Sequence, residues 1–129
     1  MIIATLFDNH ESVPADVWRW RNFTAQEIAC KHCGQVLLNF HAMDCLQALR
    51  DRLAAPVRIT SGYRCPDHNQ SVGGVPLSLH REGRAFDILT ADVDALAAIA
   101  KLAGFTGFGR YPTRGFLHVD TGPAREWAG

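Results

Sequence analysis

Two different periods of apolar and polar residues run along this chain, and they separate the expected helices from the expected strands. Between Phe40 and Leu53, apolar residues recur every three or four positions, as they do on one face of an α-helix. Residues 92–103 repeat this period, and Gly104 follows them as a typical helix end. The pattern therefore predicts two main helices, each with one face packed against a core.

Strands are expected where apolar and polar residues alternate over a short run, or where a short apolar run lies between turn residues. Such runs occupy residues 57–60, 85–89, 105–110 and 115–121. Together with the two helices, these runs indicate an α+β fold. We expect a small antiparallel sheet flanked by the two main helices, which pack behind it.

The remaining segments carry weaker signals. Thr24 and Glu27 form a capping box for a short helix that would end near Cys33. Residues 65–79, with their proline and glycine punctuation, read as a long loop, and a loop of this length in a small domain is usually functional or mobile. Residues 123–127 read as a tail.

Residues 1–22 are interpreted as an irregular N-terminal arm that contains Trp18 and Trp20. Buried tryptophan is common in small domains, so these side chains are expected to cover an edge of the core. The alternative is that they line a groove for glycan.

The chain has 129 residues, which fits a single domain over 1–129. Acidic and basic residues number 13 each, so no broad field argues for nucleic acid or an anionic membrane surface. No apolar run approaches the roughly 20 residues that span a bilayer. The first residues contain no basic segment, which predicts a protein made in the cytoplasm without a signal peptide. We expect a monomer.

The four cysteines leave three possibilities open. Cys30 and Cys33 form half of a zinc knuckle, for which Cys65 would be a third ligand and His32, Cys45 or His68 a fourth. Because a Cys-x-x-Cys without a second pair is a weak signal, reduced thiols in a protein made in the cytoplasm are favoured over a second metal. A structural disulfide is the third possibility.

The clearest chemical signal lies between residues 58 and 120. His80 and Asp87 are seven positions apart, and Gly83 between them permits the chain to turn back. His118 lies in a second expected strand, and pairing of the two strands would bring all three side chains to one point. Two histidines and a carboxylate, with a fourth position for water, are a common composition of catalytic zinc sites.

Two motifs strengthen this interpretation. Residues 78–87 read SLHREGRAFD, which matches the S-x-H-x-x-G-x-A-x-D signature of zinc D-Ala-D-Ala carboxypeptidase-type peptidases. Residues 61–64 read SGYR, another segment of that family, and His118 matches its late histidine. The chain resembles this family from about Phe23 to Trp127, and is most similar to its murein endopeptidase and phage endolysin branches.

The resemblance implies a zinc metallopeptidase that hydrolyses bonds involving D-amino acids in peptidoglycan stem peptides, as a D,D-carboxypeptidase or an endopeptidase. Zn²⁺ would be held by His80, Asp87 and His118. Arg64 is expected in catalysis and substrate binding, and Ser78 and Tyr63 in substrate binding. The absence of a signal peptide favours action on the cell wall after phage-type release, or as part of a virion.

The chain departs from the family at the general base. Many members carry an acidic residue three positions before the last histidine, where this chain has Gly115. Asp120 shares a strand face with His118 and is the best substitute, either as base or as a partner that orients a histidine. Glu82 and His68 are weaker alternatives. If Asp120 is the base, Asp120→Ala abolishes turnover and leaves zinc bound.

Gly115 also supports a second hypothesis of a different class. In this alternative the domain is a catalytically weak module that binds the cell wall and keeps the zinc site for structure. Intact His80, Asp87, His118 and Arg64 favour the enzyme.

Overall fold

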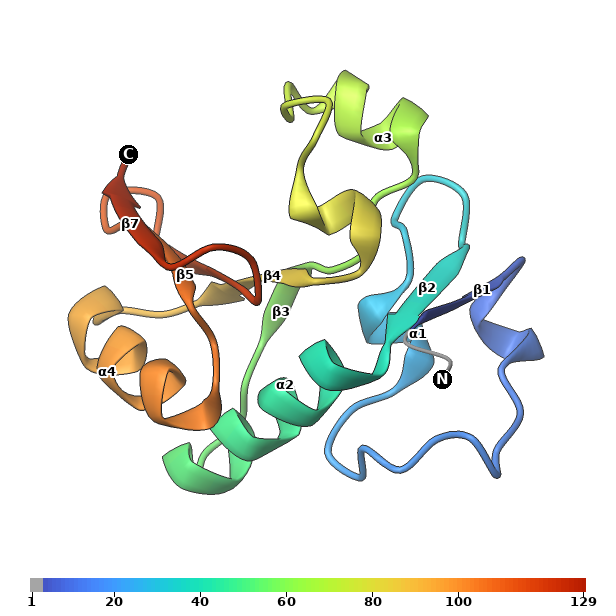
Figure 1. The fold of residues 1–129 in the computed structure, drawn as a ribbon, viewed down its shortest axis with the longest axis horizontal. Helices are drawn as coiled ribbons and strands as arrows, with labels where there is room; N and C mark the ends of the chain where they lie inside the picture. The colour runs from blue at the N-terminus through green and yellow to red at the C-terminus, as the bar shows by residue number, and fades with distance from the viewer. Residues whose placement is uncertain (1–3) are drawn as a thin grey trace.

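The computed structural model describes residues 4–129 and places them in an α+β fold with two sheets (Figure 1). The smaller sheet pairs β1 (Ala4–Phe7) with β2 (Val36–Asn39). The larger sheet has the strand order β3-β4-β6-β5-β7. Its strands are β3 (Ile59–Ser61), β4 (Ala85–Leu89), β5 (Gly107–Tyr111), β6 (Phe116–Asp120) and β7 (Arg125–Ala128). The predicted fold class is confirmed.

The register of β4 and β6 decides which side chains share a face. The two strands pair antiparallel, with Asp87 opposite His118 and Ala85 opposite Asp120. Because successive residues of a strand point to opposite faces, their chain neighbours point to the other side of the sheet. These neighbours are buried in the hydrophobic core: Phe86, Ile88, Leu117 and Val119.

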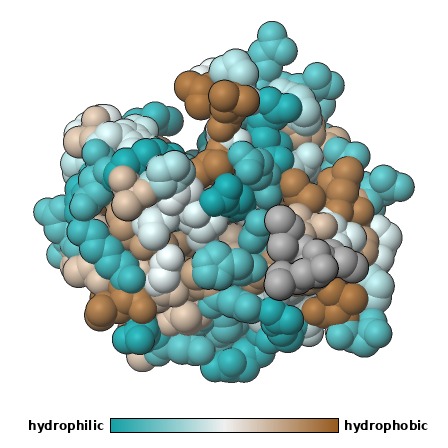
Figure 2. Space-filling model, in the orientation of Figure 1, coloured by the Kyte–Doolittle hydropathy of each residue, from teal (hydrophilic) through white to brown (hydrophobic). Residues whose placement is uncertain are grey.

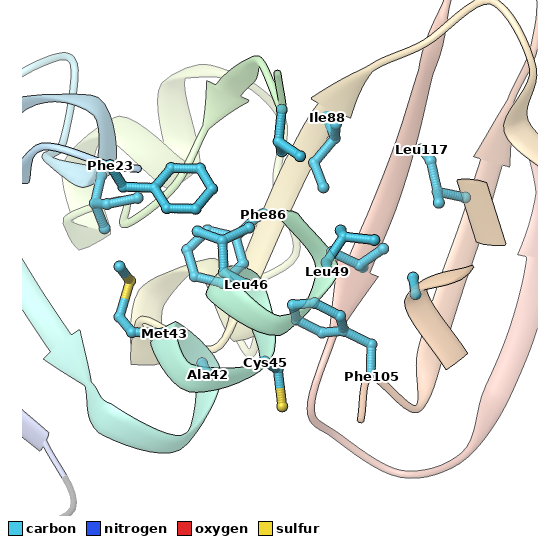
Figure 3. Packing of buried hydrophobic residues seen from close by; sticks show 14 of the residues in the cluster. Phe23, Ala42, Met43, Cys45, Leu46, Leu49, Phe86, Ile88, Phe105 and Leu117 are labelled. Carbon is cyan, nitrogen blue, oxygen red and sulfur yellow. The ribbon is translucent and has the colours of Figure 1, made fainter. Parts of the chain in front are cut away.

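The two predicted main helices form and cover that core face. They are α2 (Phe40–Leu53) and α4 (Val93–Ala103), which lie together on one side of the larger sheet (Figure 1). Asn39 and Asp92 cap their N-termini by accepting hydrogen bonds from backbone N–H groups. Apolar side chains of α2, among them Met43, Leu46 and Leu49, pack with Phe86 and Ile88 of β4 in this core (Figure 3). The opposite face of the sheet is therefore left for polar chemistry.

The larger sheet is mixed, so the prediction that it is antiparallel is wrong at one edge. Residues 125–128, expected to be part of a tail, form β7 and pair parallel to β5. Gly109 of β5 makes this possible, because a Cβ at that position would lie 2.6 Å from the ring of Trp127. A four-residue strand with one large apolar side chain carries too little alternation to be recognised in sequence.

The N-terminal arm is more ordered than expected, although its first three residues lie outside the described part. It contributes β1 and a 3-10 turn, η1 (His10–Ser12). Trp20 is buried and packs in the core, which confirms that it covers a core edge. Its indole N–H donates to Asp44 of α2 over 2.9 Å. The arm is thus held to the first main helix.

Two further segments differ from expectation. The capped helix α1 (Ala25–Ile28) forms but ends before Cys33, because residues 30–34 make a tight turn closed by the Gly34 N–H on the Cys30 carbonyl. The expected loop at 65–79 contains the helix α3 (Pro66–Ser71) and reaches into a 3-10 turn, η2 (Leu79–Glu82). Proline at the first position of α3 is compatible with a helix start. No helix within residues 4–129 has the length and apolarity needed to cross a membrane.

Candidate metal centre

Three side chains converge on the polar face of the larger sheet. His80 Nε2 lies 3.2 Å from Asp87 Oδ1, and His118 Nδ1 lies 3.0 Å from the same oxygen. All three candidate ligand atoms lie within 4.8 Å of one another. The structure therefore brings together the three residues that the sequence predicts as metal ligands.

His80 is oriented by the backbone. It lies in η2, and its Nδ1 is 2.8 Å from the carbonyl oxygen of Gly62. A carbonyl only accepts, so Nδ1 carries the proton and the lone pair of Nε2 is directed at Asp87. Gly83 ends η2 in the left-handed region, with φ of 70°, and turns the chain into β4 as predicted.

His118 is oriented by a buried carboxylate on its far side. Its Nε2 lies 2.7 Å from Asp120 Oδ2, so Nε2–H donates there and Nδ1 faces Asp87. Asp120 is fully buried, and its oxygens also accept from the Arg125 guanidinium and the Gly122 N–H. The Trp127 ring lies 5.1 Å from the imidazole. This arrangement favours the orienting role for Asp120 over the role of base.

The charges of this network stabilise one another. Burial alone would raise the pKa of Asp120, but hydrogen bonds from His118, Arg125 and Gly122 outweigh it and lower the pKa to about 2. Burial acts to lower the pKa of His118, but the hydrogen bonds of the imidazole to Asp120 and Asp87 outweigh it and raise the pKa above the ordinary value. Burial would likewise raise the pKa of Asp87, and the two histidines hold it well below the usual range. Asp87 and Asp120 are therefore carboxylates at neutral pH.

Arg64 contacts the three groups through Asp87. Its Nη2 donates to Asp87 Oδ2 over 3.2 Å, and its Nε and Nη1 donate to Ser61 and Asn69. Each oxygen of Asp87 thus has its own partners. Sequence reasoning missed Asn69, a buried amide in α3 whose position only the fold reveals.

Ser78 and Tyr63, the other expected substrate contacts, differ in position. The Ser78 hydroxyl caps η2 by accepting from the His80 N–H, and Ser78 lines the same cleft as the histidines. Tyr63 is buried behind the site, where it packs with Cys30 and Cys65. A structural role fits Tyr63 better than substrate contact.

The donor atoms fit a zinc ion. Two imidazole nitrogens and one carboxylate oxygen converge, which is the ligand composition of many catalytic zinc sites. The other nitrogen of each histidine is bound to a backbone carbonyl or a carboxylate, as is usual for metal-ligating histidines.

Comparison with known proteins supports this interpretation. The family model described as Peptidase M15 matches residues 21–120. The chain belongs to the Peptidase M15 family. This is the zinc D-Ala-D-Ala carboxypeptidase-type family, so the resemblance carried by residues 61–64 and 78–87 is confirmed.

Among curated Peptidase M15 relatives, the chain is similar to the peptidoglycan L,D-endopeptidase MepK of Escherichia coli K12. They are 41% identical over 80 residues, which cover 56% of this chain and 43% of the relative. The probable peptidoglycan L,D-endopeptidase MepK of Haemophilus influenzae is 37% identical over 82 residues, covering 58% of this chain and 44% of the relative. The chain thus spans less than half the length of these relatives.

The cleft that contains this Peptidase M15 centre has a volume of about 350 Å³. Its far wall comes from the residues that flank the β5–β6 turn, where the rings of Tyr111 at the end of β5 and Phe116 at the start of β6 stack 4.5 Å apart. Sequence reasoning assigned this turn only a connecting role, and no motif singled out its side chains. The tip of the loop after α3 overhangs the other side, where Figure 2 shows apolar surface; its exposed side chains are Val72, Val75 and Leu77.

The three candidate bases named in the sequence, Asp120, Glu82 and His68, all lie outside this cleft. Gly115 adopts φ of 77° in the β5–β6 turn, a conformation that L side chains rarely adopt. Glu82 pairs with Arg84 at another hollow, and His68 stacks on His32 near the cysteines. Within residues 4–129, Asp87 is the one carboxylate that lines the cleft.

Proposed function

We propose that this chain is a zinc peptidase that hydrolyses a peptide bond involving a D-amino acid in peptidoglycan, acting as an endopeptidase. The observation that carries the proposal is the convergence of His80 Nε2, Asp87 Oδ1 and His118 Nδ1 in an open cleft beside Arg64. Membership of Peptidase M15 and similarity to two peptidoglycan endopeptidases support the substrate class.

His80, Asp87 and His118 would hold the zinc ion. When bound, zinc polarises a scissile carbonyl and lowers the pKa of its water towards about 7. Asp120 does not enter the cleft in this proposal. It accepts from the His118 Nε2–H and so keeps His118 in the neutral tautomer whose Nδ1 can bind metal.

Arg64 would bind the substrate and hold Asp87 in place. Three hydrogen bonds to the described chain occupy three of its five N–H donors, so two are available for a carbonyl or carboxylate oxygen. Tyr111 and Phe116 would provide an apolar wall for the stem peptide, and Arg114 lies over both rings.

A binding module is the second candidate. It is favoured by one observation: beyond the ligand Asp87, no carboxylate of residues 4–129 lines the cleft to accept a proton. Such a module would keep zinc and bind the wall without cutting it.

One experiment separates the two candidates. Purified protein is incubated with whole peptidoglycan, and the soluble fragments are analysed by mass spectrometry. New peptide ends that appear only with zinc, and are absent with His118→Ala, establish the peptidase and identify the bond. If the wild-type protein retains zinc and sediments with peptidoglycan but releases no fragment, the peptidase proposal is wrong and the binding module stands.

A further inference from the structure

A second cluster of metal-ligating side chains lies outside the cleft, and the proposed function does not use it. The sulfurs of Cys30, Cys33 and Cys65 lie within 4.8 Å of one another. The first two belong to the turn after α1, and the third begins α3 more than 30 residues later. Three thiols from two distant segments have been brought together by the fold.

A fourth candidate donor lies next to Cys65, outside the group of three sulfurs. Nδ1 of His32 lies 3.7 Å from Cys65 Sγ. A tetrahedral zinc site with Zn–S bonds of about 2.3 Å separates neighbouring ligand atoms by roughly 3.5–3.8 Å. His68 stacks on His32 with ring centroids 5.9 Å apart, and so packs against the fourth donor.

The backbone around the sulfurs is organised as it would be for thiolates. The Cys65 N–H donates to Cys30 Sγ over 3.4 Å, and the His68 N–H donates to Cys65 Sγ over 3.5 Å. The turn is closed by hydrogen bonds and by Gly34 at φ of 78°, so Cys30 and Cys33 are held facing Cys65. Donors to the ligand atoms are a usual feature of metal sites.

We propose that Cys30, Cys33, Cys65 and His32 bind a second zinc ion, with a structural role. Four protein ligands would close this site, in contrast to the three-ligand site in the cleft. The ion would fasten the α1 turn to the residue that follows Arg64. It would therefore fix the segment that presents the guanidinium to Asp87. This proposal differs from the sequence-based preference for reduced thiols, because the fold brings Cys65, which the sequence offered only as a possible third ligand, within 4.8 Å of Cys30 and Cys33.

The chain offers matched variants to test the site. Cys33 is exposed, so Cys33→Ala removes a ligand with little loss of packing. Cys45, a buried thiol in α2 outside the cluster, provides the control Cys45→Ala. We expect two zinc equivalents per wild-type chain by mass spectrometry, one in Cys33→Ala, one in His118→Ala and two in Cys45→Ala.

A spectroscopic measurement assigns the ligands directly. Cobalt(II) added to the zinc-free protein should produce the near-ultraviolet band of thiolate-to-cobalt charge transfer. The band should persist in His118→Ala and Cys45→Ala and be lost in Cys33→Ala. Titration of the thiols in the unfolded protein, in the presence of a chelator, should find all four cysteines reduced.

Three results would overturn the proposal. They are a single zinc equivalent that disappears in His118→Ala, a cobalt spectrum unaffected by Cys33→Ala, and a thiol count reduced by two through a disulfide. The peptidase proposal is tested independently, because His118→Ala removes the zinc from the cleft and leaves the cysteine site loaded. Two zinc ions without hydrolysis would refute the peptidase alone.

Discussion

Asp87 offers one carboxylate oxygen to two histidines and the other to a guanidinium, so its orientation is set from both sides. Arg64→Lys keeps the positive charge but cannot reproduce the three hydrogen bonds of the planar fork. Loss of a charge-assisted hydrogen bond costs about 1.5–3 kcal/mol, so kcat/KM should fall roughly 10- to 100-fold. Zinc content measured at saturating zinc should stay at the wild-type value. Unchanged kcat/KM on peptidoglycan fragments would exclude Arg64 from substrate binding.

Asp120 provides a second test at this scale, because its two possible roles predict different responses to added zinc. As an orienting residue, Asp120→Asn should weaken zinc binding roughly 10- to 100-fold, since loss of a partner behind a ligand typically has this effect. Activity should then recover when zinc is raised. A variant that is fully loaded with zinc and still inactive would instead identify Asp120 as the base. Asparagine is preferred to alanine because it fills the same buried space.

Among the elements, β7 depends on the absence of a side chain at Gly109. A Cβ there would meet the Trp127 ring at 2.6 Å, and this ring packs beside His118. We expect Gly109→Ala to reduce the free energy of unfolding by about 1–3 kcal/mol, as overpacking does. Denaturant unfolding measures the loss. The double variant Gly109→Ala with Trp127→Ala removes the collision. If its loss of unfolding free energy equals the sum of the losses of the two single variants, the two residues do not interact.

The link between the N-terminal arm and α2 is pH-dependent. Burial acts to raise the pKa of Asp44, but hydrogen bonds from Arg19 and Trp20 outweigh it and lower the pKa. A carboxylate with a lowered pKa in the folded state stabilises the protein above its unfolded pKa of about 3.9, and this stabilisation is lost as the pH falls. Asp44→Asn keeps an acceptor for the Trp20 indole and removes the charge.

We therefore expect Asp44→Asn to be less stable than wild type at pH 7 by up to about 1 kcal/mol, the range of exposed ion pairs. The difference should shrink towards zero near pH 3. Urea unfolding at both pH values checks this expectation. If the difference in stability between the two proteins grows as the pH falls, folding raises the pKa of Asp44 instead of lowering it.

The elements that sequence predicts well are those with a repeated pattern. In α2 and α4 the apolar period extends over several turns, and β4 and β6 alternate clearly, so the pairing of Asp87 with His118 followed from the pattern. The strands β1, β2 and β7 have four residues each and depend on distant partners. For the same reason Cys65 was only one possible partner of Cys30 and Cys33 in the sequence, and the wall formed by Tyr111 had no signal along the chain.

At the scale of the whole molecule, the proposed metal ligands connect η2, β4 and β6, so zinc bound by them should stabilise the folded state against the unfolded chain. Zinc at 100 times its dissociation constant raises the free energy of unfolding by about 2.7 kcal/mol if it binds the native state alone. A strong chelator should therefore lower Tm, and zinc restored in excess should raise it again. Differential scanning calorimetry of wild type and His118→Ala measures the effect. Equal chelator shifts in both would assign the stabilisation to the cysteines instead of the cleft.

The register of β4 and β6 also governs the order of events as the chain folds. Asp87 and His118 face each other although they are 31 residues apart, and both α4 and β5 lie between them in the chain. A long-range pairing of this kind requires closure of a large loop before any ligand set exists. Zinc bound at the proposed site would therefore slow the rate of unfolding and leave the rate of folding almost unchanged. Folding and metal loading would then be separate steps, and a chain made where zinc is scarce would complete its fold first and acquire its ion later.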